Sequence, residues 1–461
     1  MNRPEGFKTF TTAGVREASA FCGLGIFRHR KSLLLFVGLM LGALLNMYVK
    51  EGFERLDFFQ STDLYKFQLS GQRLSAGESM YWAAPAEQAV ESNCRKDGQL
   101  EAGGASDKSA RAGEPSLCLH PNLNPPVFGF IALALAALPP SAAWWIWGVA
   151  SGLASLIALS LIAGTLTTKS PDLVLMTALA WVAFLFYYPS FTAYSLGQVT
   201  FFLFLPLVAG WLALRNGQDF VAGAWIGLAA SLKPFFGLFL LLFFAGRYWR
   251  AVAGFVLVGL VALMGGAWLA GVKSYFQYAS ILSDVTWLSA SWNGSIAGFL
   301  DRIARAAGDT SALRVDWLWS SMKITLVAAV LWISLGAVFK ARRLGRALQS
   351  DILFGIAVPA MLLMSPLGWL YYYPFLFLTF YAIVVCSTRL EHAVRYKLLI
   401  GVAVALTAIP TPLLPGYTLS SPQEWFWDAG RYTYALLISF GLIAFIAMRT
   451  AMPELKGQEA S

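Results

Sequence analysis

Long apolar stretches follow one another along most of the chain, separated by short joints that are basic or rich in glycine and proline. A segment that crosses the hydrocarbon core of a bilayer needs roughly 20 apolar residues and must satisfy its own backbone hydrogen bonds there. The stretches lack the alternating pattern of barrel strands. We therefore expect membrane helices near residues 32–49, 127–139, 142–164, 171–188, 199–214, 219–232, 235–246, 251–271, 319–339, 351–364, 371–388, 397–413 and 431–448.

The composition supports a bilayer rather than water as the solvent of this chain. Of its 461 residues, 57% are hydrophobic and only 13% are charged, against roughly one quarter charged in soluble domains. The formal charge of +9 could suggest nucleic acid. The basic residues instead cluster in short joints, as they do at the cytoplasmic ends of membrane helices. We expect an all-α polytopic membrane protein that does not bind nucleic acid.

The basic joints define the expected orientation of the helices. Arg28, Arg30 and Lys31 precede residues 32–49, which lack a small-residue cleavage site and are expected to be a retained first span. This places residues 1–31 in the cytoplasm, followed by a transmembrane domain over 32–449 and a polar cytoplasmic tail over 450–461. The other joints expected inside are Arg215, Arg247 with Arg250, Lys340 through Arg346, Arg389 with Arg395 and Lys397, and Arg449.

This orientation allows the crossings to be counted, and the count leaves one apolar segment more than the orientation permits. Four apolar segments lie between the first outer loop and Arg215, but only an odd number can bring the chain back inside. One of the four is therefore expected not to cross. The candidates are 127–139, which is short, and 171–188, where Tyr187-Tyr188-Pro189 could be a break. The prediction is about 12 crossings with both termini in the cytoplasm.

Two long hydrophilic stretches, about 50–126 and 271–315, then lie on the extracytoplasmic face. Residues 92–114 of the first are rich in Gly, Ala, Ser, Asp and Lys, which is typical of a mobile insertion. The same loop contains Cys94 and Cys118, where an oxidising compartment permits a disulfide; two unrelated thiols are the alternative. The four cysteines show no metal-ligand spacing.

The first outer loop carries the clearest candidate for chemistry, the segment from Asp57 through Asp63 to Tyr65. A carboxylate beside aromatic rings at a membrane surface lies in a medium of lowered dielectric, which makes it a candidate general base. The alternative is a solvated loop carboxylate.

A second candidate is Lys233, followed by Pro234 between two short apolar runs. The far ends of these runs, Arg215 and Arg247, are both expected inside, so Lys233 lies at or below the outer membrane surface. A buried cation there is costly and marks a site for an anion, which the helix N-terminus after Pro234 could also bind. The alternative is a lysine that extends to the lipid headgroups.

Other polar turns are expected at the same level of the membrane. Amides and indoles in such turns suit sugar hydroxyls and rings, but they also suit helix capping and the aromatic belt. The residues concerned are Asn122 and Asn124 with the neighbouring His120, Gln198 after Gly197, Trp369 after Ser365-Pro366, and, as weaker candidates in the second outer loop, Asn293 and Arg302.

The motifs of soluble nucleotide-dependent enzymes are missing from the sequence. It has no Gly-Lys-Ser/Thr phosphate loop, no Gly-x-Gly-x-x-Gly and no cluster of metal ligands. An enzyme on the outer face also has no access to cytoplasmic nucleotide sugars. An activated donor would have to arrive within the membrane as a lipid-linked phosphate ester, and no metal or other cofactor is expected.

Five motifs between Leu56 and Pro374 stand in an order and at spacings that match one known family. They are the segment from Asp63 through Gly77 to Tyr81, Asn122-Leu-Asn-Pro-Pro126, Gly197-Gln198, Ala222-Gly223-x3-Gly227-x5-Lys233-Pro234, and Ser365-Pro366-x2-Trp369. With these motifs the chain resembles the polyprenol-phosphate-mannose-dependent membrane glycosyltransferases of family 87, which have a GT-C fold. The insertion that contains Cys94 and Cys118 departs from the family pattern.

The resemblance implies an inverting hexosyltransferase of the bacterial inner membrane, with its active site on the periplasmic face. It would transfer a hexose, mannose being the commonest in the family, from a polyprenyl-phosphate donor to a lipid or glycan acceptor. Asp63 matches the family's general base, with Asp57 as its rival, and Lys233 is expected at the donor phosphate. Asn122, Asn124, Gln198, Trp369 and Tyr65 are expected to bind substrate.

The main alternative function is a polytopic transporter or flippase for lipid or sugar in envelope polysaccharide assembly. Polytopic chains with broken helices and one buried lysine are common among transporters. Transporters, however, place their sites near the midplane of the membrane, and the polar turns of this chain are expected on one face. No inverted repeat is visible in the sequence either.

Overall fold

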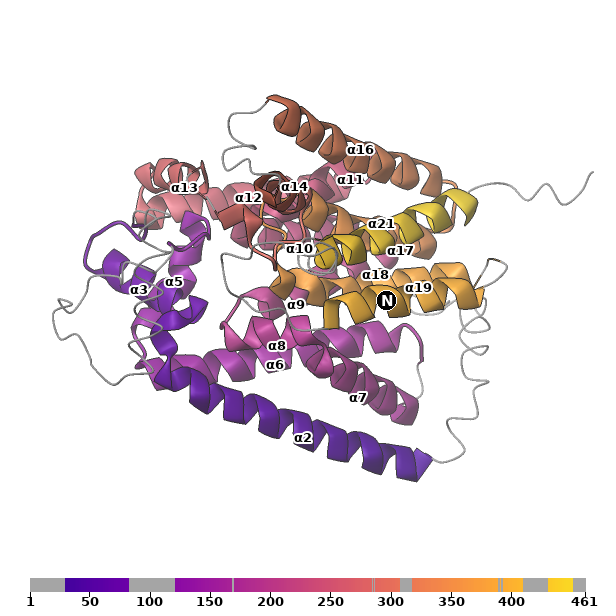
Figure 1. Cartoon of the computed structure of the whole chain (residues 1–461), viewed down its shortest axis with the longest axis horizontal. Helices are drawn as coiled ribbons and strands as arrows, with labels where there is room; N and C mark the ends of the chain where they lie inside the picture. Colours follow the sequence, from indigo (N-terminus) through magenta and orange to yellow (C-terminus); the bar gives the residue numbers. More distant parts are fainter. Residues whose placement is uncertain are drawn as a thin grey trace, which may run out of the picture.

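The computed structural model is a bundle of helices and describes residues 30–82, 121–167, 170–283, 285, 287–306, 317–388, 390, 393–408 and 430–450 (Figure 1). Its α-helices are α2 (Arg30–Asp57), α3 (Asp63–Ser75), α5 (Gly129–Ala136), α6 (Pro140–Gly164), α7 (Ser170–Phe186), α8 (Tyr188–Ser195), α9 (Thr200–Arg215), α10 (Asp219–Leu232), α11 (Leu238–Gly246), α12 (Trp249–Ala270), α13 (Lys273–Ser283), α14 (Ile296–Ala306), α16 (Trp317–Ala341), α17 (Arg346–Met364), α18 (Leu376–Ser387), α19 (Ala393–Ala408) and α21 (Arg431–Thr450). Short 3-10 helices are η2 (Phe59–Ser61), η3 (Pro126–Phe128), η4 (Pro234–Gly237), η5 (Trp287–Ser289) and η6 (Leu370–Phe375).

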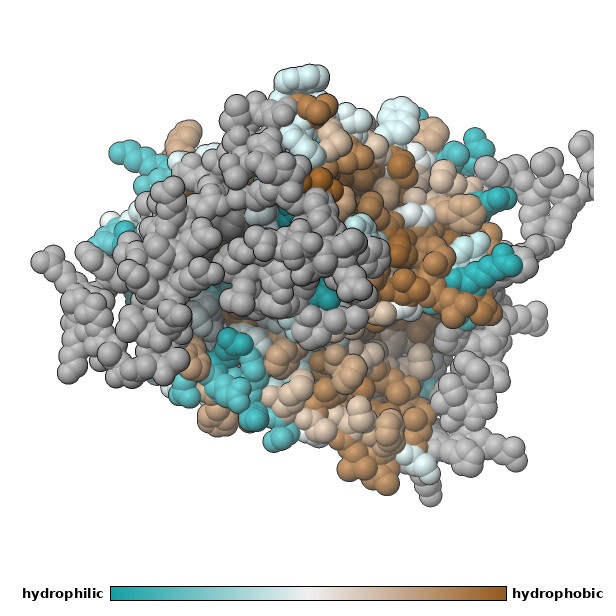
Figure 2. All heavy atoms as spheres, viewed as in Figure 1, coloured by the Kyte–Doolittle hydropathy of each residue, from teal (hydrophilic) through white to brown (hydrophobic). Residues whose placement is uncertain are grey.

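The apolar helices confirm an all-α polytopic membrane protein. In the described part of the chain, 7 helices are long and apolar enough to cross a membrane, or up to 8 if the bent pair α7 and α8 is one span. Four shorter apolar helices accompany them. Figure 2 shows a broad area of hydrophobic side chains right of the centre of the face drawn, with hydrophilic side chains on either side of it. The number of 12 crossings stays a prediction.

The excess segment before Arg215 can be interpreted from helix lengths. Helix α5 has 8 residues, which at 1.5 Å per residue span about 12 Å of a hydrocarbon core of about 30 Å. It packs along α3, where Gly71 faces the backbone of Ala132 so closely that a side chain would not fit. Helices α9, α10 and α11 are also shorter than the candidate membrane spans, so the identity of the segment that does not cross stays a prediction.

The predicted break at Tyr187-Tyr188-Pro189 is also present. Helices α7 and α8 meet there at 69°. Pro189 has no backbone N–H, so it is tolerated in the first turn of α8 but not within a continuous helix. As a result α8 leads away from the axis of α7 and ends just before the turn that contains Gly197 and Gln198.

The two outer stretches contain more helix than the hydropathy pattern predicted. Helix α2 continues to Asp57, eight residues beyond the expected end of the first apolar segment, and an ion pair of 2.7 Å between Glu51 and Arg55 spans its last turns. Helices α3, α13 and α14 also form within the expected loops. Figure 1 shows α3, α5 and α13 gathered at one end of the bundle (left).

The expected cytoplasmic ends of the central helices are joined by a buried ion pair. Arg215, at the end of α9, donates to both oxygens of Asp351 on α17 at 2.7 and 2.8 Å. Trp211 donates to the same carboxylate at 2.9 Å, and Arg215 also donates to Tyr381. The carboxylate is 1% exposed, so these donors compensate the cost of burying its charge.

Candidate functional site

The candidate site is built around the first residue of α3, Asp63. Thr62 caps this helix, because its hydroxyl accepts the backbone N–H of Tyr65 at 3.2 Å. A helix that begins at this cap places the carboxylate of Asp63 in its first turn, where the helix dipole favours a negative charge. The local sequence therefore fixes where the acid lies.

The turn after α8 docks directly onto this helix start. The carbonyl of Leu196 accepts the backbone N–H of Asp63 at 2.8 Å. Gly197 has φ of 64°, and a Cβ there would lie 2.6 Å from Cβ of Leu64. Only glycine permits this conformation and this close approach without strain. The next residue, Gln198, donates from its Nε2 to the Oδ2 atom of Asp63.

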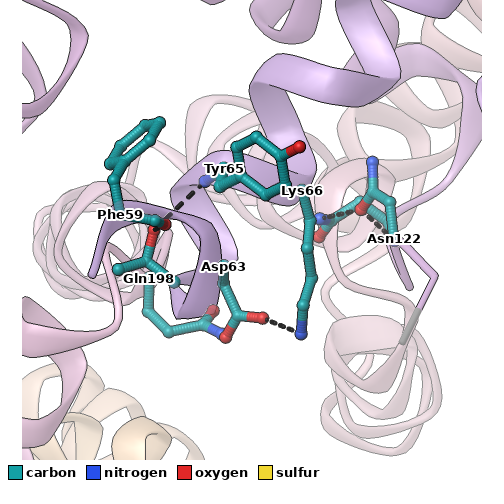
Figure 3. Close-up of polar contacts among 8 residues, drawn as sticks. Phe59, Asp63, Tyr65, Lys66, Asn122 and Gln198 are labelled. Carbon is teal, nitrogen blue, oxygen red and sulfur yellow. Dashed lines mark hydrogen bonds and ion pairs between the residues drawn. The ribbon is translucent and has the colours of Figure 1, made fainter. Parts of the chain in front are cut away.

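Lys66 completes the immediate surroundings of the acid. Its Nζ donates to Oδ1 of Asp63 at 2.6 Å, and the two side chains are 18% and 17% exposed. Figure 3 shows Lys66 and Gln198 reaching Asp63 from opposite sides. The sequence analysis missed Lys66. The signal that could have found it is its position three residues after Asp63 in a helix, which places both side chains on one face.

Lys233 lies near the same carboxylate. It occupies the extended turn between α10 and η4, outside the helices, and is 9% exposed. Burial lowers the pKa of Lys233 to about 8; the negative charge of Asp63 opposes this shift, and the positive charge of Lys66 adds to it. Asp63 therefore has two ammonium groups close enough to interact with it electrostatically. The helix that follows Pro234 begins with the 3-10 helix η4 rather than with an α-helical turn.

A row of aromatic rings leads from the second outer stretch to Lys233. The ring centroids are separated by 6.0 Å between Trp292 and Trp369, 6.2 Å between Trp369 and Tyr371, and 4.8 Å between Tyr371 and Tyr372. The Nζ of Lys233 lies 5.7 Å from the centroid of Tyr372. Trp369 is thus connected to the lysine through two tyrosines that the sequence analysis did not single out.

Asn293 and Arg302 stabilise the end of this row that contains Trp369. Asn293 is fully buried, donates to the carbonyls of Leu288 and Pro366 at 3.0 and 2.9 Å, and accepts the N–H of Gly368 at 2.9 Å. Arg302 donates to the carbonyl of Asn293 at 2.9 Å. An isolated antiparallel bridge between Asn293 and Trp369 joins the two segments. These contacts position Trp369.

Asn122 and Asn124 do not belong to α3 but lie beside it, near Ser70. Asn122 donates to the hydroxyl of Ser70 at 3.2 Å and accepts from the side chain of Asn124 at 2.6 Å. Tyr81 donates to the carbonyl of Asn124 at 2.7 Å, and burial raises the pKa of the Tyr81 phenol. The two asparagines thus fasten the Pro125-Pro126 turn to α3, and no hydrogen bond is described between them and Asp63.

The remaining predicted residues divide into two groups. Asp57 is exposed at the end of α2, and the ring of Tyr65 packs edge-on against Phe59 with centroids 5.8 Å apart. No described hydrogen bond or ion pair links either side chain to Asp63. His120, Cys94 and Cys118 lie outside the described residues.

The site combines a carboxylate held in a fixed orientation, that of Asp63, with the positive charges of Lys66 and Lys233. A carboxylate held by two donors can still accept a hydrogen bond from a hydroxyl, since its oxygens offer about four lone-pair positions. Two ammonium groups nearby suit an anion such as a phosphate. The described residues contain no group of three or more His, Cys, Asp or Glu side chains that could hold a metal ion.

A bundle of apolar helices with such a site at one end defines a membrane protein equipped for an anionic substrate. The sequence profile of glycosyltransferase family 87 matches residues 122–366, more than half of the chain. The protein belongs to this family and is a membrane glycosyltransferase. The match includes Gln198 and Lys233, while Asp63 precedes it.

A characterised relative supports the same assignment. The chain is 26% identical over 350 residues to the polyprenol-phosphate-mannose-dependent alpha-(1-2)-phosphatidylinositol pentamannoside mannosyltransferase of Mycolicibacterium smegmatis. The alignment covers 70% of this chain and 76% of the relative. No solved structure matches the chain. Family membership decides between the two alternative functions in favour of the glycosyltransferase.

Proposed function

We propose that this protein transfers mannose from a polyprenyl-phosphate donor to a lipid or glycan acceptor, with inversion at the anomeric carbon. The observation that carries the proposal is the carboxylate of Asp63, bonded by Lys66 and Gln198, with Lys233 close to it. The dependence of the mycobacterial relative on polyprenol-phosphate-mannose supports the donor. The site lies on the extracytoplasmic face of a bacterial inner membrane.

In the proposed reaction Asp63 is the general base. It removes the proton from an acceptor hydroxyl as that oxygen forms a bond to the anomeric carbon. The bond between the anomeric carbon and the phosphate oxygen breaks, and polyprenyl phosphate leaves with the bonding electrons. Lys233 stabilises the negative charge that develops on the leaving phosphate, and its ammonium needs no reorganisation because it is already buried in place.

Lys66 and Gln198 have different tasks in this mechanism. Each donates to one oxygen of Asp63, so together they fix the plane of the carboxylate. Lys66 also places a positive charge 2.6 Å from one oxygen of this carboxylate. The charges needed at the phosphate come from lysines, so the mechanism includes no metal ion.

The proposal is tested with purified protein, polyprenyl-phosphate-mannose and a panel of lipid and glycan acceptors. Asp63→Asn retains the size and shape of the side chain but removes the base, so the turnover number should fall by about 10²-fold or more. The matched control is Asp57→Asn, which removes the exposed rival carboxylate and should retain activity. Full activity of Asp63→Asn would exclude it as the base.

The phosphate role is tested separately. Lys233→Ala should raise the apparent KM for the donor, while Lys273→Ala, which removes an exposed lysine at the start of α13, should leave it unchanged. An unchanged donor KM in Lys233→Ala would contradict the role of Lys233.

A further inference from the structure

A small cavity borders the side chain of Gln198. It is lined by residues of α6, the end of α8, the turn that follows α8 and the start of α9, among them Trp147, Ser151 and Gln198. Its free volume of about 10 Å³ is roughly the room that one water molecule needs. None of the motifs discussed above includes Trp147 or Ser151.

Four buried polar atoms border this cavity without a hydrogen-bond partner among the described residues. One of them, Nε1 of Trp144, lies close to the hydroxyl of Tyr194, and the other three are Oε1 of Gln198, Nε1 of Trp147 and Oγ of Ser151. The side chains are more than nine-tenths buried, with exposed fractions of 6%, 8% and 3%. Buried polar groups in native proteins almost always have a partner, and three such atoms around one cavity require a common one.

We propose that the cavity binds one water molecule that bridges Gln198 to Trp147 and Ser151. The water donates to Oε1 of Gln198 and accepts the indole N–H of Trp147, and its remaining valences match the hydroxyl of Ser151, which can donate or accept. Bound in this way, the water satisfies all three atoms at once.

The consequence for the site concerns the orientation of one amide. A side-chain amide can turn by 180°, which exchanges its donor and its acceptor. With Oε1 held by the water, Nε2 points at Asp63; in the flipped state Oε1 would face the carboxylate and repel it. Trp147 and Ser151 are therefore positioning residues that act on Asp63 through Gln198. This inference rests on the proposed role of Asp63.

The first test compares Trp147→Phe and Ser151→Ala with two controls on the same helix. Phenylalanine retains the packing of Trp147 against Phe67 and Phe202 but removes the N–H. Each variant should lower kcat by about three- to tenfold, the worth of one hydrogen bond, without changing the donor KM. The controls are Trp145→Phe, which does not border the cavity, and Ser160→Ala, whose hydroxyl bonds within the helix to Leu156; both should retain kcat.

A double-mutant cycle shows whether the effect passes through Gln198. In a Gln198→Ala background, Trp147→Phe and Ser151→Ala should have no further effect on kcat, because the amide that they orient is gone. Effects that persist undiminished in that background, or a donor KM that changes together with kcat, would overturn the positioning role, since they would indicate a general structural defect.

A second measurement does not depend on activity. An experimental structure at a resolution that reveals buried waters should contain density within hydrogen-bonding distance of Oε1 of Gln198 and of Nε1 of Trp147 or Oγ of Ser151. An empty cavity at that resolution would overturn the proposal. If the wild-type protein transferred no sugar from any polyprenyl-phosphate donor, the proposed function would fail, and the density alone would decide the water site.

Discussion

Replacing Gly197 by alanine tests the contact on which the site depends. Gly197 sits between Leu196, whose carbonyl accepts the N–H of Asp63, and Gln198, whose amide donates to the Asp63 carboxylate. Its φ is 64°, and an added Cβ would lie 2.6 Å from Cβ of Leu64. An ordinary carbon contact begins near 3.4 Å, so the turn and the start of α3 must separate by about 0.8 Å.

Two costs follow from this geometry. An alanine in the left-handed region is destabilised by roughly 1–2 kcal/mol, and forcing an extra methyl group into a packed contact costs typically 1–3 kcal/mol. Together they predict a loss of about 2–5 kcal/mol of folding free energy. The displacement also moves the amide of Gln198 relative to Asp63, and a misplacement near 1 Å costs on the order of 10²-fold in rate. We expect kcat to fall by about 10- to 100-fold.

The assay measures kcat and thermal unfolding in the same detergent for Gly197→Ala and for a matched control. The control is Gly77→Ala, because Gly77 has φ of 77° but no heavy atom within 4 Å of the added Cβ. It carries the left-handed strain without the clash, so it should lose roughly 1–2 kcal/mol and retain wild-type kcat. Equal kcat and equal stability of the two variants would refute the argument that Gly197 is required for the close approach to Leu64.

Four further predictions concern the charges. Lys66→Met removes a charge-assisted hydrogen bond worth about 1.5–3 kcal/mol, so kcat should fall about tenfold or more with little change in donor KM. The pKa of Lys233 is lowered to about 8, so its charge is lost as the pH rises through this value; donor KM should increase between about pH 7 and 9 in wild type but not in Lys233→Ala. Asp351→Ala leaves Arg215 without its buried partner and should cost about 3 kcal/mol, measured by thermal unfolding, with the donor KM retained. Treatment with EDTA should leave activity unchanged, because lysines supply the positive charge; loss restored by Mg²⁺ or Mn²⁺ would contradict the metal-free mechanism.

Hydropathy predicted the apolar helices well because a bilayer imposes one strong constraint. A segment in its hydrocarbon core needs apolar side chains and must form all its backbone hydrogen bonds internally. The break at Tyr187-Tyr188-Pro189 was likewise predictable from the local chemistry of proline. The helices in the outer stretches were not, since α13 and α14 are amphipathic, and tertiary contacts rather than hydropathy stabilise them.

The site was predictable in part for a similar reason. Asp63, Gln198 and Lys233 each lie in a turn or at a helix end, where a charged or polar residue is conspicuous against an apolar background. Lys66 is within a helix in a hydrophilic stretch and is therefore inconspicuous in the sequence. The contact between Asp63 and Gln198 joins residues 135 positions apart, and periodicity contains no information about such a pairing.

The charges of the site suggest why two lysines accompany one acid. A polyprenyl-phosphate sugar is a phosphodiester with one negative charge; with Lys66, Lys233 and ionised Asp63 the assembly is neutral before transfer. During the proposed reaction Asp63 gains a proton and becomes neutral, while the leaving polyprenyl phosphate becomes a dianion. The sum is zero again, so negative charge moves from the carboxylate to the phosphate within a partly buried set of groups whose total charge does not change. Because an uncompensated charge is costly in a medium of low dielectric, removing either lysine would leave the site with one excess negative charge in both states. Removing Lys233 should then weaken donor binding, and removing Lys66 should lower turnover, because Lys66 is the lysine with a described hydrogen bond to the base.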